Sequence, residues 1–191
     1  MNWKSKSVQS LIKKSSINDP IEIIRNKARE LVVNAYNEGW AGPPFDPIRL
    51  AQTMGYIVLP NEELIDARTI PNKENSYTIE YNPYQKEARI NFSIAHEIGH
   101  TFFPDCNETI RNREDEKDSD TWELEFLCDI AASEILLPYA EFTNEANSIP
   151  LDLDSLIKIA NKYKASIESV FLRFCEVIDK PCTIILSSFN N

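Results

Sequence analysis

The chain has 191 residues, of which 42% are hydrophobic and 26% are charged; this ordinary globular composition excludes a fibrous or wholly disordered chain. Thirty acidic and twenty basic side chains give a formal net charge of -10, and such a charge repels phosphate backbones and anionic lipid headgroups. We therefore expect a protein that binds neither nucleic acid nor a membrane directly.

The first 18 residues form a basic segment, with four lysines and no acidic residue before Asp19. We expect residues 1–18 to be a basic N-terminal tail that frays or seeks a partner, and residues 19–191 to form a single domain. The segment lacks the apolar core and the cleavage site of a secretory signal, and no later stretch is long and apolar enough to span a bilayer. This pattern predicts a cytoplasmic protein.

Two aspartate-proline pairs mark the starts of the first predicted helices. Asp19 and Pro20 supply an N-cap and a first-turn proline, and apolar residues then recur at helical spacing over residues 21–36. Asp46 and Pro47 repeat this signal for a short helix that ends before Gly55.

Three short stretches have the composition of strands. Residues 56–59, 77–81 and 88–92 are rich in β-branched or aromatic side chains, and prolines or turn-forming residues separate them. They predict a small antiparallel sheet.

The second half of the chain has mainly helical patterns. We expect a helix over residues 93–103, an acidic surface loop over residues 104–120, and a strongly apolar helix over residues 121–137 that Pro138 halts.

A helical pair over residues 153–163 and 166–177, with Ser166 as an N-cap, and a last strand over residues 183–187 close the predicted chain. Because helices outnumber strands and the strands cluster early, the predicted fold class is α+β, with helices packed on one side of a small sheet.

The strongest motif is H-E-x-x-H at His96-Glu97-Ile98-Gly99-His100, which contains both histidines of the chain. Residues i and i+4 share a helix face, so the two imidazoles can bind a single zinc ion. A catalytic zinc lowers the pKa of its water from about 15.7 toward about 7, and we expect Glu97 to be the general base. Manganese or iron also fits histidine and carboxylate ligands.

A catalytic zinc site needs a third protein ligand, and Glu125 on the next predicted helix fits best. Asp129 lies four residues further on the same helix face, where its carboxylate can accept a hydrogen bond from His96 or His100 and fix the tautomer. This order, with Glu-x-x-x-Asp after H-E-x-x-H, is the gluzincin arrangement.

Other donors and neighbours are also candidates. Cys106, Asp105 and Glu123 are the alternative third ligands, and Cys128 is expected to pack in the helix beside Glu125 or to serve as a redox-sensing thiol. Gly99 inside the helix predicts that another element passes close behind the two histidines, because glycine costs about 1 kcal/mol there relative to alanine.

Two segments together resemble the ImmA/IrrE family of metallopeptidases. From Arg89 the chain reads R-x-x-F-S-x-A-H-E-I-G-H, and from Glu125 it reads E-x-x-C-D-x-A-A-x-x-I-L-L-P. The likeness extends over about residues 20–177. It implies a zincin-like active-site helix, a second ligand helix and a closing helical pair.

The resemblance also implies an activity and a partner. It implies a zinc-dependent endopeptidase that cleaves a helix-turn-helix repressor and so relieves repression of a mobile element or a stress regulon, with His96, His100 and Glu125 as zinc ligands and Glu97 serving the water. The alternative is a zinc-stabilised binding protein that sequesters a repressor or antitoxin without cutting it. A structural domain with an inert metal in a closed shell of four protein ligands is a further alternative.

The expected mechanism needs a substrate-binding strand and an oxyanion donor. We expect an extended substrate segment to add to residues 77–81 as an edge strand. The oxyanion donor is a backbone N–H or one of four side chains, namely Tyr77, Tyr81, Arg89 and Tyr139.

Overall fold

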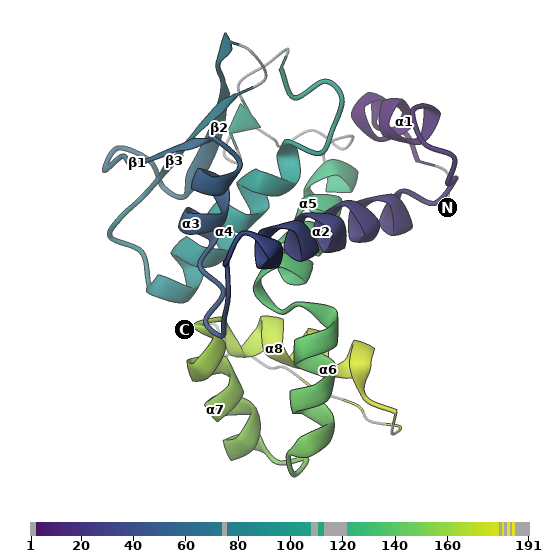
Figure 1. Cartoon of the computed structure of the whole chain (residues 1–191), viewed down its shortest axis with the longest axis vertical. Coiled ribbons are helices and arrows are strands. Elements are labelled where there is room, and N and C mark those ends of the chain that lie inside the picture. The colour runs from purple at the N-terminus through teal and green to yellow at the C-terminus, as the bar shows by residue number, and fades with distance from the viewer. Residues whose placement is uncertain are drawn as a thin grey trace.

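Two packed helices, α4 (Glu87–His100) and α5 (Trp122–Leu136), occupy the centre of the molecule (Figure 1). The computed structural model describes residues 3–73, 76–107, 111–112, 122–179, 181, 183 and 185. Six further helices lie within these residues: α1 (Lys6–Lys13), α2 (Pro20–Asn37), α3 (Pro47–Thr53), α6 (Tyr139–Ser148), α7 (Leu153–Tyr163) and α8 (Ile167–Val177). Most of the acidic segment 104–120 and of the expected last strand 183–187 falls outside the described residues.

The predicted helix starts are confirmed by their capping contacts. The Asp19 carboxylate accepts a hydrogen bond from the Ile21 amide at 3.0 Å, and the Asp46 carboxylate accepts one from the Ile48 amide at 2.9 Å. The Ser166 hydroxyl accepts one from the amide three residues later. These contacts satisfy amides that have no partner inside a helix. The helix α6, which follows directly after Pro138, was not predicted.

The sheet has four strands, which are β1 (Ile57–Pro60), β2 (Ala67–Pro71), β3 (Tyr77–Tyr81) and β4 (Arg111–Asn112) in the order β1-β3-β2-β4. The β1 and β3 pair is parallel, and β2 runs antiparallel to β3 and β4. The expectation of an antiparallel sheet is therefore wrong. The 16 residues between β1 and β3 include β2, and this length allows the return that a parallel pair requires.

Two strand expectations also fail. Residues 88–92 form the first turns of α4, because Ala88 and Phe92, like Ile90 and Ile94, are spaced four residues apart and continue the helical pattern of the motif. Tyr77–Tyr81 is an interior strand with partners on both sides, so it is not the expected edge strand.

The N-terminal segment is ordered against the core over its described part. α1 buries Val8 and Leu11 in a cluster with side chains of α2 and α5. Just before α1, the backbone amides of Lys4 and Ser5 donate to the Glu123 carboxylate at 2.8–3.0 Å. The expectation of a frayed tail is therefore wrong for these residues.

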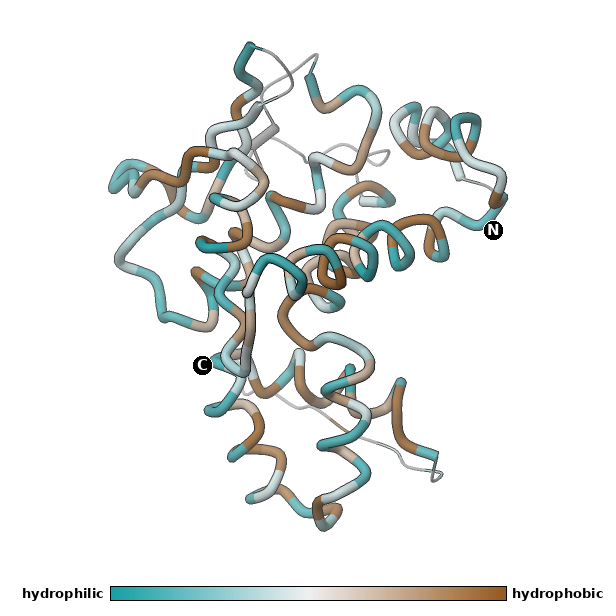
Figure 2. Tube along the Cα trace, in the orientation of Figure 1, coloured by the Kyte–Doolittle hydropathy of each residue, from teal (hydrophilic) through white to brown (hydrophobic). Residues whose placement is uncertain are grey.

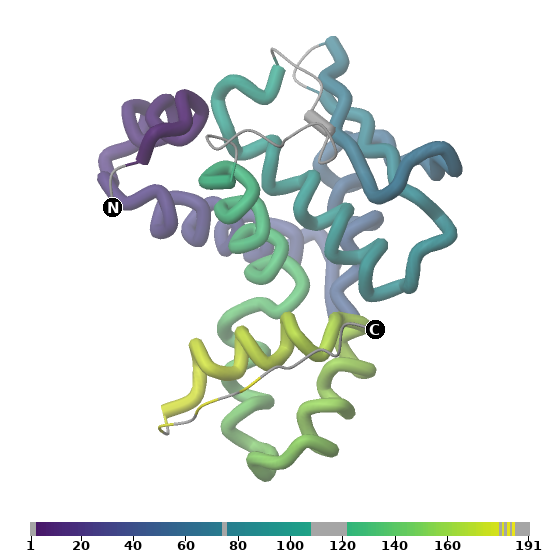
Figure 3. Tube along the Cα trace, turned by 180° about the vertical axis from the view of Figure 1, so that it is seen from behind, coloured from purple at the N-terminus to yellow at the C-terminus, as the bar shows by residue number. Residues whose placement is uncertain are grey.

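Most of the other elements lie at two ends of the central helix pair. The sheet and α3 pack on α4 at one end, while α6, α7 and α8 gather at the other (Figures 1 and 3). Apolar stretches meet where α2, α4 and α5 cross (Figure 2). The fold class is α+β, as the sequence predicts. None of the described helices combines the length and the apolar character needed to cross a membrane.

A buried ion pair joins α8 to the central helix α5. Arg173 on α8 donates to both Glu134 carboxylate oxygens on α5, at 2.7 and 3.1 Å, and to the Leu137 carbonyl at 2.9 Å. Arg29 on α2 adds a hydrogen bond to Glu134 at 3.0 Å. The Glu134 and Arg173 side chains are 0% and 2% exposed. Burial raises the pKa of Glu134, but the hydrogen bonds and charge of the two arginines outweigh it and lower that pKa.

We expect Glu134→Gln to destabilise the fold by about 3 kcal/mol or more at neutral pH, because Arg173 would remain buried without a full counter-charge. The folded-state pKa of Glu134 is lowered, so its stabilisation is present above the ordinary pKa near 4.5 and is lost as the pH falls through the lower folded value. Urea unfolding at pH 7 and pH 3 should therefore show a smaller difference between wild type and variant in acid. An equal difference at both pH values would contradict this role.

Candidate metal centre

Close packing of α4 on α5 places the H-E-x-x-H motif in the protein interior. Residues 93–100 are all buried. A Cβ atom added at Gly99 would lie 3.0 Å from the Ala131 Cβ atom and 3.2 Å from the Cys128 Cα atom. The predicted close passage behind the histidines is thus confirmed, and the passing element is α5.

The two histidines face one carboxylate of α5. The His96 Nε2 atom lies 2.9 Å from Glu125 Oε2, and the His100 Nε2 atom lies 3.3 Å from Glu125 Oε1. The two imidazole rings are 4.9 Å apart at their centroids, with an interplanar angle of 73°. The structure therefore brings together the three side chains that the sequence analysis named as metal ligands.

The spacing of these atoms suits a small divalent ion. Tetrahedral ligands that each lie about 2.0–2.1 Å from zinc are about 3.3 Å from one another. The Glu125 oxygens lie at 2.9 and 3.3 Å from the two ring nitrogens. Two imidazoles and one carboxylate also form a donor set that zinc accepts in catalytic sites. The residues therefore fit the ion.

The outer nitrogen of His96 has a carboxylate partner. Its Nδ1 atom lies 2.8 Å from Asp129 Oδ1, which is the arrangement that orients a metal-binding imidazole. Burial lowers the pKa of His96, whereas the carboxylates of Asp129, Glu125 and Glu97 raise it, and the net pKa is about 9. These surroundings therefore favour positive charge at the site, whether a proton or a cation carries it.

The outer nitrogen of His100 contacts a thiol instead. Cys128 Sγ lies 3.4 Å from His100 Nδ1, and one ligand atom from each of His96, His100 and Cys128 lies within 4.8 Å of the others. The described residues thus offer two donor sets, completed by Glu125 or by Cys128. An imidazole presents its two nitrogens in different directions, so an ion that faces both Nε2 atoms meets Glu125, while Cys128 contacts the other nitrogen of His100. The sequence analysis missed this contact.

Glu97 also has a buried partner that the sequence analysis missed. The Thr69 hydroxyl on β2 lies 2.6 Å from Glu97 Oε2, and both residues are 1% exposed. Because β2 itself was not predicted, the sequence analysis did not link the two residues. A Thr within a short strand before the motif is the one feature that could have suggested the contact.

The alternative third ligands have other partners. Glu123 accepts the amides of Lys4 and Ser5, and Asp105 accepts a hydrogen bond from the Ser7 hydroxyl. Cys106 is buried in the turn after α4. Glu123 and Asp105 are therefore hydrogen-bonded to the N-terminal segment.

The oxyanion candidates are spread over the molecule. The Tyr77 hydroxyl donates to Asn107 at 2.6 Å, and Tyr139 stacks under the guanidinium groups of Arg29 and Arg173 at the other end of α5. Arg89 pairs with Asp66 but also lines a cavity of about 460 Å³ that Asp129 lines too. Tyr81 lies on the interior strand β3. Arg89 thus shares a cavity with Asp129, which contacts His96.

Fold and site together define an α+β protein with an H-E-x-x-H helix whose histidines face a carboxylate on the following helix. The chain belongs to the peptidase M78 family, described as the IrrE N-terminal-like domain, whose family model matches residues 51–174. This membership confirms the family resemblance seen in the sequence. No curated protein matches the chain.

A solved structure adds support for the fold. A Mycobacterium tuberculosis transcriptional regulator is similar over 85% of this chain, with a TM-score of 0.52 and 16% sequence identity. The chain spans about half of that regulator, because the match covers 54% of its length. At this level of identity, the likeness shows the fold alone.

We expect Asp129→Asn to weaken zinc binding by about 10- to 100-fold. The asparagine amide still accepts a hydrogen bond from His96, but it lacks the negative charge that makes His96 a stronger metal ligand. Competition with a chromophoric chelator measures the change. The matched control is Asp154→Asn in the exposed first turn of α7, which should bind zinc as wild type does. Equal affinity in all three proteins would show that Asp129 does not support the metal centre.

Proposed function

We propose that the protein is a zinc-dependent endopeptidase that hydrolyses a peptide bond in a protein substrate. The observation that supports this best is the convergence of His96 Nε2, His100 Nε2 and the Glu125 carboxylate, with the Glu97 side chain on the same helix as both histidines. Three protein ligands leave a fourth position for water or substrate, as in catalytic zinc sites. Membership of the peptidase M78 family agrees with this activity.

Each side chain has a distinct role in the proposed reaction. His96, His100 and Glu125 would hold the ion, and Asp129 would orient His96. Zinc in this site would supply Lewis acidity, which activates water and polarises the scissile carbonyl. Zinc is the metal that we propose, and manganese or iron would fit the same ligands.

Glu97 carries the proton in this proposal. Its carboxylate takes a proton from the attacking water as the carbon–oxygen bond forms, and then gives that proton to the amine nitrogen as the carbon–nitrogen bond breaks. One water is consumed, and one carboxyl group and one amine are released. Burial of Glu97 keeps this transfer away from bulk solvent.

We place the substrate segment at β2 and not at β3, where the sequence analysis expected it. Both β3 and β2 lie inside the sheet, but within the described residues β2 pairs with β4 only over Arg68 and Thr69, and β2 also touches Glu97 through Thr69. We therefore propose that an extended substrate segment approaches along β2, where main-chain hydrogen bonds can orient it toward Glu97.

A helix-turn-helix repressor is the substrate that we propose. The family resemblance implies such a substrate, and the similar solved structure is titled a transcriptional regulator. The net charge of -10 disfavours direct contact with DNA, so the repressor itself is the proposed partner.

A second candidate is a metal-stabilised binding protein that sequesters its partner without cleavage. It would require Cys128, which has its Sγ within 4.8 Å of ligand atoms of both histidines, to bind the ion as a fourth protein ligand, and this would close the shell and leave no place for water. The two functions differ in whether Glu97 is needed.

We expect Glu97→Gln to abolish cleavage while zinc content and folding stay as in wild type, because glutamine keeps the side-chain shape but cannot accept the proton. The assay mixes purified zinc-loaded protein with helix-turn-helix regulators from the same source and follows fragments by mass spectrometry. Glu87→Gln, an exposed substitution in the first turn of the same helix, is the matched control and should cleave normally. Full activity of Glu97→Gln would remove Glu97 from the mechanism. Relief of repression by an uncut partner would instead support sequestration.

A further inference from the structure

The contact between β2 and α4 assigns a role to a residue outside the motif. We propose that Thr69 is a positioning residue, whose hydroxyl holds the Glu97 carboxylate in the orientation that proton transfer requires. This inference rests on the proposed peptidase function and adds a residue from the sheet to it.

The hydrogen bond is short, buried and specific. Thr69 Oγ1 lies 2.6 Å from Glu97 Oε2 and 3.2 Å from the Glu97 carbonyl oxygen. A hydroxyl has one proton to donate, and an ionised carboxylate accepts it more strongly than a carbonyl does. The nearer carboxylate oxygen is therefore its acceptor. One oxygen of Glu97 is then engaged by the protein.

The sheet fixes the position of this donor. In the middle of β2, Thr69 is paired with Ile79 on β3 and with Arg111 on β4. A β-branched side chain on a strand has few accessible rotamers. The hydroxyl is thus held by the strands, independently of the helix that carries Glu97.

A glutamate without such a donor would sample several orientations. Its side chain has three rotatable bonds, and fixing all three costs conformational entropy. A general base acts only when it lies within hydrogen-bond reach of the proton that it takes. Thr69 supplies this order before substrate binds, so its loss should reduce turnover more than substrate binding.

The main test compares three variants of the full-length, zinc-loaded protein in the cleavage assay. Thr69→Val keeps the shape and removes the hydroxyl, whereas Thr69→Ser keeps the hydroxyl. Thr78→Val on the neighbouring strand β3 is the matched control, because its hydroxyl bonds to Asn72 on the surface. We expect Thr69→Val to lower kcat about tenfold or more with KM within about twofold, while Thr69→Ser and Thr78→Val stay within about threefold of wild type.

A kcat for Thr69→Val equal to that of wild type would overturn the proposal. So would an equal loss in Thr69→Ser, because a hydroxyl would then not suffice. If Thr69→Val does not fold, Thr69→Ala and Thr69→Ser are compared, since they differ only in the hydroxyl. In that pair, turnover should again follow the hydroxyl.

A second readout does not need activity. Urea unfolding of metal-free wild type, Thr69→Val, Glu97→Ala and the double variant gives the coupling between the two positions. We expect a coupling of about fivefold or more in the unfolding constant, and a coupling below about twofold would overturn the contact. If zinc-loaded wild type cleaves no regulator, the peptidase proposal fails, and this coupling still decides whether Thr69 holds Glu97.

Discussion

The approach of α4 to α5 at Gly99 is the constraint on which the site depends. The two helices come so close that a Cβ atom at Gly99 would meet both Ala131 and the backbone of Cys128. This spacing lets Glu125 reach both Nε2 atoms and lets Asp129 reach the far side of His96. A larger separation would leave the half-buried Glu125 carboxylate and the two buried imidazoles without one another as partners. The same close approach therefore packs the two helices and pairs their polar side chains.

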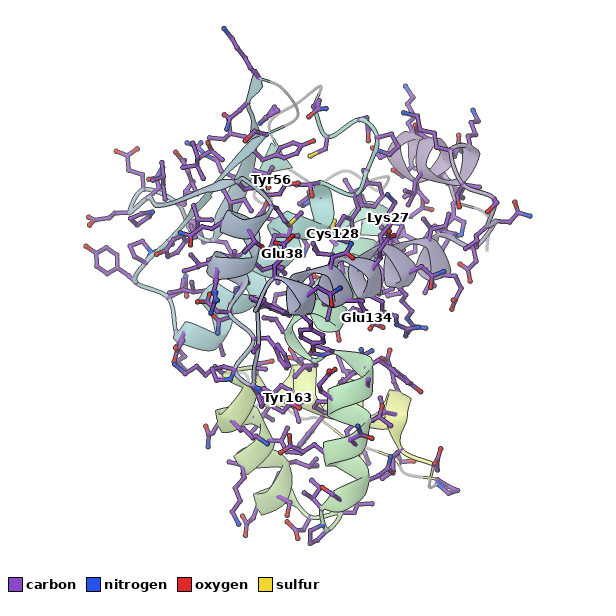
Figure 4. All side chains as sticks on the ribbon, in the orientation of Figure 1. Lys27, Glu38, Tyr56, Cys128, Glu134 and Tyr163 are labelled. Carbon is purple, nitrogen blue, oxygen red and sulfur yellow. The ribbon has the colours of Figure 1, made fainter. Side chains whose placement is uncertain are left out.

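The surrounding elements stabilise this helix pair from three directions. The N-terminal segment binds Glu123 at the start of α5 through backbone amides, and the sheet contacts α4 through Thr69 and Glu97. At the far end of α5, Glu134 is bound by arginines from α2 and α8. Figure 4 labels Glu134 together with Cys128, the α5 residue that contacts His100. The site is thus built on rigid elements, which suits chemistry that needs atoms held in place.

The sequence predicted the features that depend on contacts between residues close together in the chain. Asp19, Asp46 and Ser166 cap helices because their side chains bond to amides two or three residues away, and such contacts leave a readable pattern. The spacing of the motif likewise placed His96 and His100 on one face. Long-range strand pairing left no such pattern in the sequence. β2 contains Arg68 and ends at Pro71, so its composition does not indicate a strand. Residues 88–92 suit either a strand or a helix, and only their continuation into α4 shows that they are helical. For this reason the sheet order, Thr69 and the thiol contact of His100 came only from the structure.

The central claim is that one divalent ion is bound by two imidazole nitrogens and the Glu125 carboxylate, with Cys128 outside the ligand set. X-ray absorption spectroscopy at the zinc edge of the loaded protein tests this claim most directly, because zinc–sulfur distances near 2.3 Å are separate from zinc–nitrogen and zinc–oxygen distances of about 2.0–2.2 Å. We predict one zinc per chain with nitrogen and oxygen neighbours only. A sulfur neighbour at the longer distance would place Cys128 in the ligand set and contradict the account.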